Sequence, residues 1–321
     1  MALALACLVV VFGAYVRLND AGLGCPDWPG CYGHAAVPQS DLARATAEAK
    51  FPGAELEPRK AWIEMIHRYL AGVLGLLILA IAILAWRRRG AGTPVLQTVL
   101  VLLVAFQAAL GMWTVTLLLK PAVVTLHLLG GMLTLSLLVW LALREVEWRP
   151  LPQGETVARL RPWALLALGV AFCQIAVGGW VSANYAALAC IDFPTCHGTL
   201  APPADYAHGF HVLRELGMSP EGAPLSNEAL NAIHWTHRLG AMLTLLVVGG
   251  TALAALRLER ARPFALLVLI ALAIQIAIGI SNVVFLLPLW LAVAHNAGAG
   301  FLLIALLMLN FRLSHRYTSH V

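Results

Sequence analysis

Four histidines in apolar stretches of the chain form two pairs of similar spacing. His67 precedes His127 by 127 − 67 = 60 residues, and His237 precedes His295 by 295 − 237 = 58 residues. Ionisable side chains inside a membrane are costly and usually functional. Imidazole is a standard axial ligand of heme iron, and two facing helices of a bundle can supply one ligand each. The spacing therefore predicts two equivalent bis-histidine heme sites; hydrogen bonds between helices are the alternative role.

The sequence around the histidines is an internal repeat. Segment 178–198 repeats segment 13–33 at a constant offset (178 − 13 = 165), and segment 234–238 repeats segment 64–68. A duplicated unit that keeps two histidines in each copy is suited to binding the same kind of group twice. A bare metal ion suits it less, because each copy lacks the carboxylate or thiolate that would complete a cage within the membrane.

Within the motif Glu64-x-x-His67-Arg68, the first named residue differs between the two copies, since the repeat partner of Glu64 is His234. Glu64 lies three residues before His67, so the two side chains share a helix face. A carboxylate beside a bound heme can take a proton or stabilise positive charge on a reacting carbon, and His234 cannot supply a negative charge. Glu64 is therefore the predicted catalytic residue. The structural alternative is that it orients a ligand or pairs with Arg68.

An arginine directly follows a histidine in each copy, at Arg68 and Arg238. At the outer interface these guanidinium groups are candidates to bind heme propionates through charge-assisted hydrogen bonds. Snorkelling toward the lipid headgroups is an equal alternative.

Two close cysteine pairs, Cys25/Cys31 and Cys190/Cys196, begin the two long polar loops. These loops are predicted to face the oxidising compartment, where disulfides persist, so pairing within each loop is the first interpretation. Such a bond can be a structural staple, or a redox pair that passes electrons by thiol–disulfide exchange. Zinc binding is weaker, because the spacings do not match common finger patterns.

The composition is that of a membrane protein. The chain is 60% hydrophobic and only 12% charged, with a mean hydropathy of +0.81, which excludes an ordinary soluble domain. A spanning helix needs about 20 apolar residues. Eight stretches meet this requirement: 1–18, 62–85, 94–118, 122–143, 163–183, 231–256, 263–285 and 288–311. We therefore predict an all-α membrane protein with two pseudo-symmetric four-helix bundles in a tandem parallel repeat, residues 1–150 and 151–321.

Arginines gather on one side of the predicted membrane helices, which sets their orientation by the positive-inside rule. They are Arg87, Arg88, Arg89, Arg144, Arg149, Arg159, Arg161, Arg257, Arg260, Arg262, Arg312 and Arg316. Both termini are therefore predicted in the cytoplasm, and the cysteine loops and histidines toward the outer face. This asymmetry explains the net charge of +5 without a nucleic-acid partner. Within the outer loops, 41–50 and 210–216 are candidate short surface helices.

The motifs resemble those of the heme A synthase family over nearly the whole chain. They are Gly22-Leu-Gly-Cys25-Pro-Asp-Trp-Pro29, Glu64-x-x-His67-Arg68, His127, His234-x-x-His237-Arg238 and His295-Asn296. The chain departs from the family in its long outer loops, which carry a Pro-rich insertion before Asn231. The resemblance implies an eight-helix protein of the bacterial cytoplasmic (inner) membrane that oxidises a ring methyl of heme O to a formyl group through hydroxylated intermediates.

The resemblance also implies a role for each matched residue. His67 and His127 would flank the substrate heme O in the N-terminal half, and His237 and His295 would ligate a heme b cofactor in the C-terminal half. Glu64 would be essential for turnover. Cys25/Cys31 would be the cysteine pair implicated in activity, and Cys190/Cys196 the more structural pair.

The partners implied are membrane lipid, heme O, heme O synthase, assembly factors of a-type cytochrome oxidase, an electron acceptor of unknown identity and a second copy of the chain. Three other classes of function compete with this one. A bis-histidine b-type cytochrome needs the four histidines but not Glu64 and usually places its hemes at opposite depths. A non-catalytic heme-handling assembly factor needs no carboxylate. A thiol oxidoreductase leaves the histidines without a role.

Overall fold

The computed structural model describes residues 1–88, 93–148, 151 and 154–314, and no β-strand occurs in this part of the chain. The predicted all-α class is therefore confirmed. Arg89, Arg149 and Arg316, which enter the orientation argument, and the boundary between the predicted halves at 150 lie outside the described residues. The long helices are α1 (Ala2–Leu18), α3 (Pro58–Arg87), α4 (Val95–Thr116), α5 (Pro121–Arg144), α6 (Glu155–Ala183), α8 (Asn227–Ala255), α9 (Arg262–Val284) and α10 (Leu289–Ser314).

Seven of these described helices, all except α1, are long and apolar enough to cross a membrane. Helix α1 is apolar but has 17 residues, fewer than the roughly 20 that a span needs, so the predicted count of eight spans stays a prediction. Several helices start before the apolar stretch from which they were predicted. Helix α6 begins at Glu155 and α8 at Asn227, because a hydropathy pattern detects only the apolar part of a helix.

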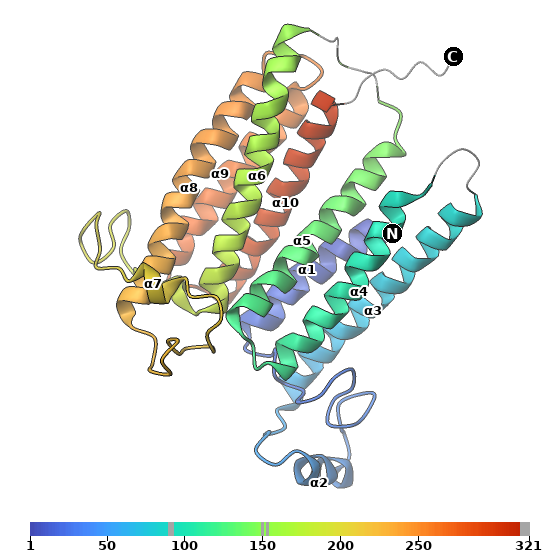
Figure 1. Ribbon diagram of the computed structural model, residues 1–321, viewed down its shortest axis with the longest axis vertical. Helices are drawn as coiled ribbons and strands as arrows, with labels where there is room; N and C mark the ends of the chain where they lie inside the picture. The colour runs from blue at the N-terminus through green and yellow to red at the C-terminus, as the bar shows by residue number, and fades with distance from the viewer. Residues whose placement is uncertain (89–92, 149–150, 152–153, 315–321) are drawn as a thin grey trace.

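The long helices form two closed groups of four that pack side by side (Figure 1). In the first group α1 contacts α3, α3 contacts α4, α4 contacts α5 and α5 contacts α1. In the second group α6 contacts α8, α8 contacts α9, α9 contacts α10 and α10 contacts α6. The groups meet where α5 and α1 pack against α6 and α10. Short connections make α3–α4, α4–α5, α8–α9 and α9–α10 antiparallel neighbours, whereas long loops join α1 to α3 and α6 to α8.

A polar clasp joins the two groups at the end of α1. Arg17 donates a hydrogen bond to the carbonyl oxygen of Ser182 at 2.7 Å, and its guanidinium carbon lies 4.0 Å from the centroid of the Tyr185 ring. The Tyr185 hydroxyl donates to Oδ1 of Asp20 at 2.7 Å. These contacts tie the loop that follows α1 to the loop that follows α6.

The two long loops contain short helices, of which one was predicted correctly. Helix α2 (Asp41–Lys50) is confirmed, and Ser40 caps it by accepting a hydrogen bond from the Ala43 amide. The predicted helix at 210–216 is wrong: a four-residue helix, α7 (Tyr206–Gly209), precedes it and turns follow. Helix α7 ends at Gly209 because that residue is pressed against α8, where a Cβ would lie 2.7 Å from the Ala229 carbonyl oxygen.

Candidate functional site

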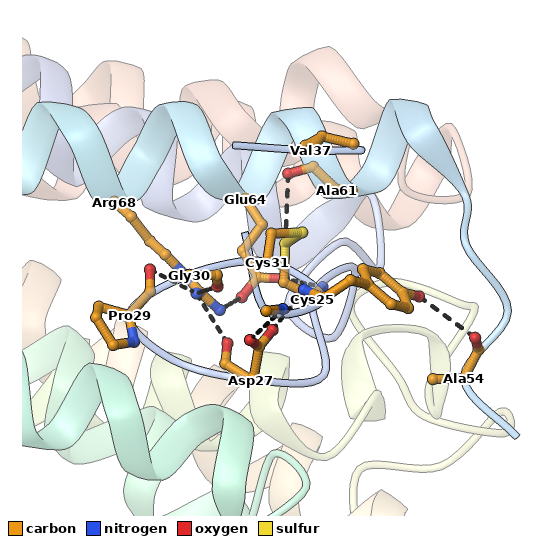
Figure 2. The surroundings of a disulfide bond; sticks show 12 residues. Cys25, Asp27, Pro29, Gly30, Cys31, Val37, Ala54, Ala61, Glu64 and Arg68 are labelled. Carbon is orange, nitrogen blue, oxygen red and sulfur yellow. Dashed lines mark hydrogen bonds and ion pairs between the residues drawn. A yellow bond between two sulfur atoms is a disulfide. The ribbon is translucent and has the colours of Figure 1, made fainter. Parts of the chain in front are cut away.

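Glu64 is buried near the N-terminal end of α3 with both carboxylate oxygens engaged (Figure 2). Its residue exposure is only 4%. Oε2 accepts a hydrogen bond from the backbone amide of Cys25 at 2.9 Å, and Oε1 pairs with the guanidinium of Arg68 one helical turn away. The predicted alternative, pairing with Arg68, is therefore present in the structure. It does not test catalysis, because a paired carboxylate can still act on a bound group.

The guanidinium of Arg68 holds the loop between Cys25 and Cys31 through hydrogen bonds. Its Nη1 donates to the carbonyl oxygens of Asp27 at 2.9 Å and Pro29 at 3.3 Å, and also to that of Gly30. Asp27 in turn accepts from the amides of Tyr32 and Gly33 at 2.6 and 2.7 Å. Arg68 thus links Glu64 to the loop between the two cysteines, and its role toward a propionate stays a prediction.

The second half builds the same arrangement with a histidine in place of the carboxylate. Nδ1 of His234 accepts from the amide of Cys190 at 3.1 Å. Arg238 donates to the carbonyl oxygens of Cys190, Asp192 and Thr195 at 2.7, 2.8 and 2.6 Å. Asp192 is held like Asp27: hydrogen bonds from the Thr195 hydroxyl and from the amides of the loop depress the pKa of its carboxyl group. The two halves therefore share the loop architecture and differ in charge at one side chain.

Both predicted disulfides are formed. The Cα atoms of Cys25 and Cys31 lie 4.8 Å apart, as do those of Cys190 and Cys196. All four cysteines are fully buried, so each bond closes a compact loop against the end of its helix. The geometry does not test whether either pair takes part in redox chemistry.

Each of the four histidines in the helices packs against a glycine of a neighbouring helix. A Cβ added at Gly13 would lie 3.0 Å from the His67 ring, and one at Gly178 would lie 3.0 Å from the His237 ring. The corresponding distances are 3.4 Å from Gly111 to His127 and 3.0 Å from Gly279 to His295. The glycines are needed because a side chain there would displace an imidazole from the bundle interior.

A glutamine clamps the backbone of two of these histidines. The Nε2 of Gln174 donates to the carbonyl oxygen of His237 at 2.8 Å and lies 3.0 Å from its Nδ1. Gln275 donates to the carbonyl oxygen of His295 at 3.0 Å. Each glutamine occupies the space over a glycine three residues after its histidine, Gly240 and Gly298.

The first half keeps the position of this glutamine for only one of its histidines, and without the hydrogen bond. Gln107 occupies the space over Gly130, three residues after His127, but its Nε2 is buried without a hydrogen-bond partner. The residue three positions after His67 is Leu70, and the repeat partner of Gln174 is Val9 (174 − 9 = 165). His67, next to Glu64, is thus the one member of the four without a matching glutamine.

The histidines fit a group that binds imidazole nitrogen. Nδ1 of His67, His127 and His295 is buried without a hydrogen-bond partner, and buried polar atoms normally have one. The rings of His237 and His295 lie edge to face, at an interplanar angle of 79° with centroids 6.4 Å apart. No group of three or more His, Cys, Asp or Glu side chains that could hold a metal ion occurs in the described ranges. Two imidazoles that each offer a ring nitrogen suit a porphyrin iron, whose macrocycle fills the other positions.

The fold and this site define a multi-pass helical membrane protein with a pair of half-buried histidines inside each group of four helices, on α3 and α5 in the first group and on α8 and α10 in the second. Residues 1–307 match the family described as cytochrome oxidase assembly protein, and the chain belongs to that family.

The curated relatives agree with this placement. The chain is 46% identical to the heme A synthase of Shewanella oneidensis over 97% of its own length and 94% of the relative's. It is 32% identical to the heme A synthase of Methylobacterium radiotolerans over 91% and 83%. It is 30% identical to that of a Caulobacter species over 92% and 89%. The family resemblance inferred from the motifs is therefore confirmed.

Sequence reasoning missed the residues that support the histidines. Gln174 and Gln275 carry a detectable signal, since a glutamine lies four residues before the glycine that packs on a histidine (178 − 174 = 4 and 279 − 275 = 4). Arg214 carries no such signal in the sequence. It lies in a polar loop, where an arginine is ordinarily solvated, yet only 2% of it is exposed.

Proposed function

We propose that this protein is a heme A synthase, an oxidoreductase that converts a ring methyl of heme O into a formyl group through hydroxylated intermediates. The observation that carries the proposal is the difference between the two halves. Each half packs two histidines against glycines, but only the first has a buried carboxylate, Glu64, one helical turn from one of them. The 46% identity to a heme A synthase over nearly the whole chain supports the same activity.

The two halves of the chain would have different roles in the reaction. In residues 1–150, His67 and His127 would hold the substrate heme O; in residues 151–321, His237 and His295 would hold heme b. When bound, heme b supplies one-electron transfer, which lets electrons leave the substrate site. The glutamine clamps favour this division, since a permanently bound cofactor gains from rigid ligands. A substrate must leave the site after the reaction, so it is better bound by a less rigid ligand such as His67, whose backbone is not held by a glutamine.

Glu64 would act on the reacting methyl carbon. Oxidation of that carbon releases protons and develops positive charge on the carbon. A buried carboxylate can accept a proton and can stabilise the positive charge. The hydrogen bond from Cys25 and the ion pair with Arg68 stabilise the charged form of the carboxylate against burial and fix it in place. His234, at the matching position, would leave the other half without this chemistry.

The cysteine pair beside Glu64 would also take part in turnover. The Cys25–Cys31 disulfide can accept electrons by reduction to two thiols, and its backbone is bonded to Glu64. Cys190–Cys196 would be the structural pair. Arg68 and Arg238 stay candidates for the heme propionates, in exchange for some of the loop carbonyls that they now bind.

The setting of the protein follows from the same family. We propose eight spans in two pseudo-symmetric bundles in the bacterial cytoplasmic membrane, with both termini inside and the histidines toward the outer face. Heme O synthase and assembly factors of a-type cytochrome oxidase would be neighbours in the membrane. The electron acceptor and a homo-oligomer are further proposed partners.

A pigment extract tests the function directly. The chain is produced in cells that also make heme O but have no heme A synthase of their own, and the hemes are separated by chromatography and mass spectrometry. Heme A or its hydroxylated precursor in the extract is expected. Unchanged heme O, with heme still bound to the purified protein, would instead indicate a b-type cytochrome or a heme-handling factor.

A further inference from the structure

Arg214 is a buried cation without an anion. It lies in the outer loop after α7, only 2% of it is exposed, and it is one of the largest fully buried side chains in the described protein. The residues before it, Val212 and Leu213, are exposed, so the chain turns this one side chain inward. Charged side chains are almost never fully buried unless paired.

The contacts of Arg214 leave part of its guanidinium unsatisfied. Nη2 donates to the side-chain oxygen of Asn184 at 2.5 Å, and the guanidinium carbon lies 5.7 Å from the centroid of the Trp180 ring. Nε and Nη1 are buried and have no hydrogen-bond partner. The neighbouring carboxylate does not serve, because Glu215 pairs with Lys120 at 2.8 Å. Burial lowers the pKa of the guanidinium, the direction expected when no anion compensates the charge.

Arg214 lies at the end of α6 that contacts the histidine helices of both halves. It lies over Trp180, two residues beyond Gly178, the glycine that touches His237, and on a different face of α6. Between them, Gly179 faces α5, where a Cβ would lie 2.8 Å from Leu128, the residue after His127. This part of α6 thus contacts the histidine helix of each half.

A second unsatisfied group approaches the same part of α6. The hydroxyl of Thr125 on α5 is buried without a partner, and its methyl carbon would lie 3.4 Å from a Cβ at Gly179. Arg214 and Thr125 therefore supply hydrogen-bond donors over adjacent residues of one helix, at the junction of the two four-helix groups.

We propose that Arg214 is a carboxylate-binding residue that takes a propionate of a porphyrin bound between the histidines. A carboxylate can accept from a free donor of the guanidinium, Nε on one edge or Nη1 on the other, and neutralises its charge. The carboxylate can come from the porphyrin of either half. The inference rests on the proposed function for the presence of a porphyrin but not for its oxidation. It assigns the propionate to a residue other than Arg68 and Arg238, whose donors already bind loop carbonyls.

The test compares iron protoporphyrin with its dimethyl ester, which lacks free carboxylates, as ligands of the full-length protein in lipid nanodiscs. Binding is followed by the absorbance of the bis-histidine heme. Arg214→Gln should weaken binding of the acid by about tenfold or more, the loss of a charge-assisted contact, and leave binding of the ester unchanged. Arg214→Lys should restore part of the preference for the acid. Arg159→Gln, which removes an exposed arginine paired with Glu155, should change neither ligand.

Two further variants identify the source of the carboxylate. His127→Ala leaves the second histidine pair intact, and His237→Ala leaves the first. The background in which Arg214→Gln still lowers the affinity for the acid names the half whose porphyrin Arg214 binds.

The outcomes separate this inference from the proposed function. Equal weakening of acid and ester by Arg214→Gln, or no weakening of either, would overturn the propionate role. Unchanged heme O in cells, together with an acid preference that depends on Arg214, would overturn the synthase activity alone. Absence of heme binding by the unmutated protein would overturn both.

Discussion

The carboxylate of Glu64 and the backbone amide of Cys25 are joined by a 2.9 Å hydrogen bond between residues 39 positions apart. The bond makes the redox-capable loop and the histidine helix a single unit, because Glu64 lies on the same helix as His67. In the second half the same bond runs from Cys190 to His234 at 3.1 Å. The loop is therefore held equally well by a neutral ring, so holding the loop does not by itself require a negative charge at position 64.

Glu64→Gln should abolish heme A formation while heme stays bound. The amide oxygen can still accept the hydrogen bond from Cys25, so the loop keeps its anchor, but the charge and the proton acceptor are lost. We expect turnover to fall by about a hundredfold or more, the usual contribution of a general acid or base. Pigment extraction measures the product, and the heme absorbance of the purified variant measures occupancy. Full activity in this variant would refute the catalytic role.

Gly178→Val should disrupt the second histidine pair. The valine Cβ would lie 3.0 Å from the His237 ring, closer than an imidazole tolerates, so the ring must move. The purified variant should lose the bis-histidine absorbance of one site. Gly169→Val on the same helix is the control, since a Cβ at Gly169 has no neighbour within 4 Å. Equal loss of heme in both variants would mean that α6, and not the ring contact, is damaged.

Gln174→Met should loosen His237 without removing it. The variant keeps a side chain of similar length but loses the donor to the His237 carbonyl oxygen, worth about 1 kcal/mol. Heme affinity at the second site should fall about fivefold, measured by heme transfer to apomyoglobin. Val9→Met at the matching position of the first half should have no such effect. A comparable loss from both substitutions would argue against the clamp.

The loop around α7 should be held most tightly in a limited pH range. The hydrogen bond and charge of Asp205 raise the pKa of His208, with a smaller contribution from Glu221; Asp205 has its own pKa lowered, first by the His208 amide and then by the His208 ring. The histidine's contribution is present below its ordinary pKa and is lost as pH rises through the raised value. The aspartate's contribution is present above its ordinary pKa and is lost as pH falls through the lowered value.

Hydrogen exchange of segment 205–221, corrected for the intrinsic pH dependence of exchange, measures this range. Protection should be highest at mildly acidic pH and should decline toward alkaline pH and toward strongly acidic pH. Asp205→Asn should flatten the alkaline side of the profile, because it removes the main cause of the raised histidine pKa. A profile that the substitution does not alter would show that another pair governs the loop.

Much of the fold follows from the sequence because the bilayer imposes it. Apolar stretches of about 20 residues can only be helices in hydrocarbon, so every long apolar helix was predicted, including α4 and α9, which carry little else that is recognisable. The repeat also predicted both disulfides and the proximity of Glu64 to Arg68. Local spacing sufficed for these, since the partners lie within six residues of each other along the chain.

The rest depended on packing between distant segments, which one sequence does not contain. The prediction of a helix at 210–216 was wrong: α7 ends before it, packed against α8. The sequence of a polar loop contains no signal of that contact. The burial of Arg214 could not be predicted for the same reason, because it depends on contacts with Trp180 and Asn184, which are more than 29 residues away in the sequence. The glutamine clamp joins Gln174 to His237 across 63 positions, and only the geometry shows that Val9 breaks the pattern in the first half.

Asp20 and Tyr185 stand at matching places in the repeat (185 − 20 = 165) and are bonded to each other across the junction. Arg17 and Ser182 have the same relationship (182 − 17 = 165). Matching positions that touch are what a half-length ancestor would produce by pairing with its own copy, where each residue meets its twin. Twins in such a pair must be identical, so an aspartate would have faced an aspartate. A single chain with two different copies is free of that constraint: it can place an acid opposite a phenol where the copies meet, and a carboxylate in one copy where the other has a histidine.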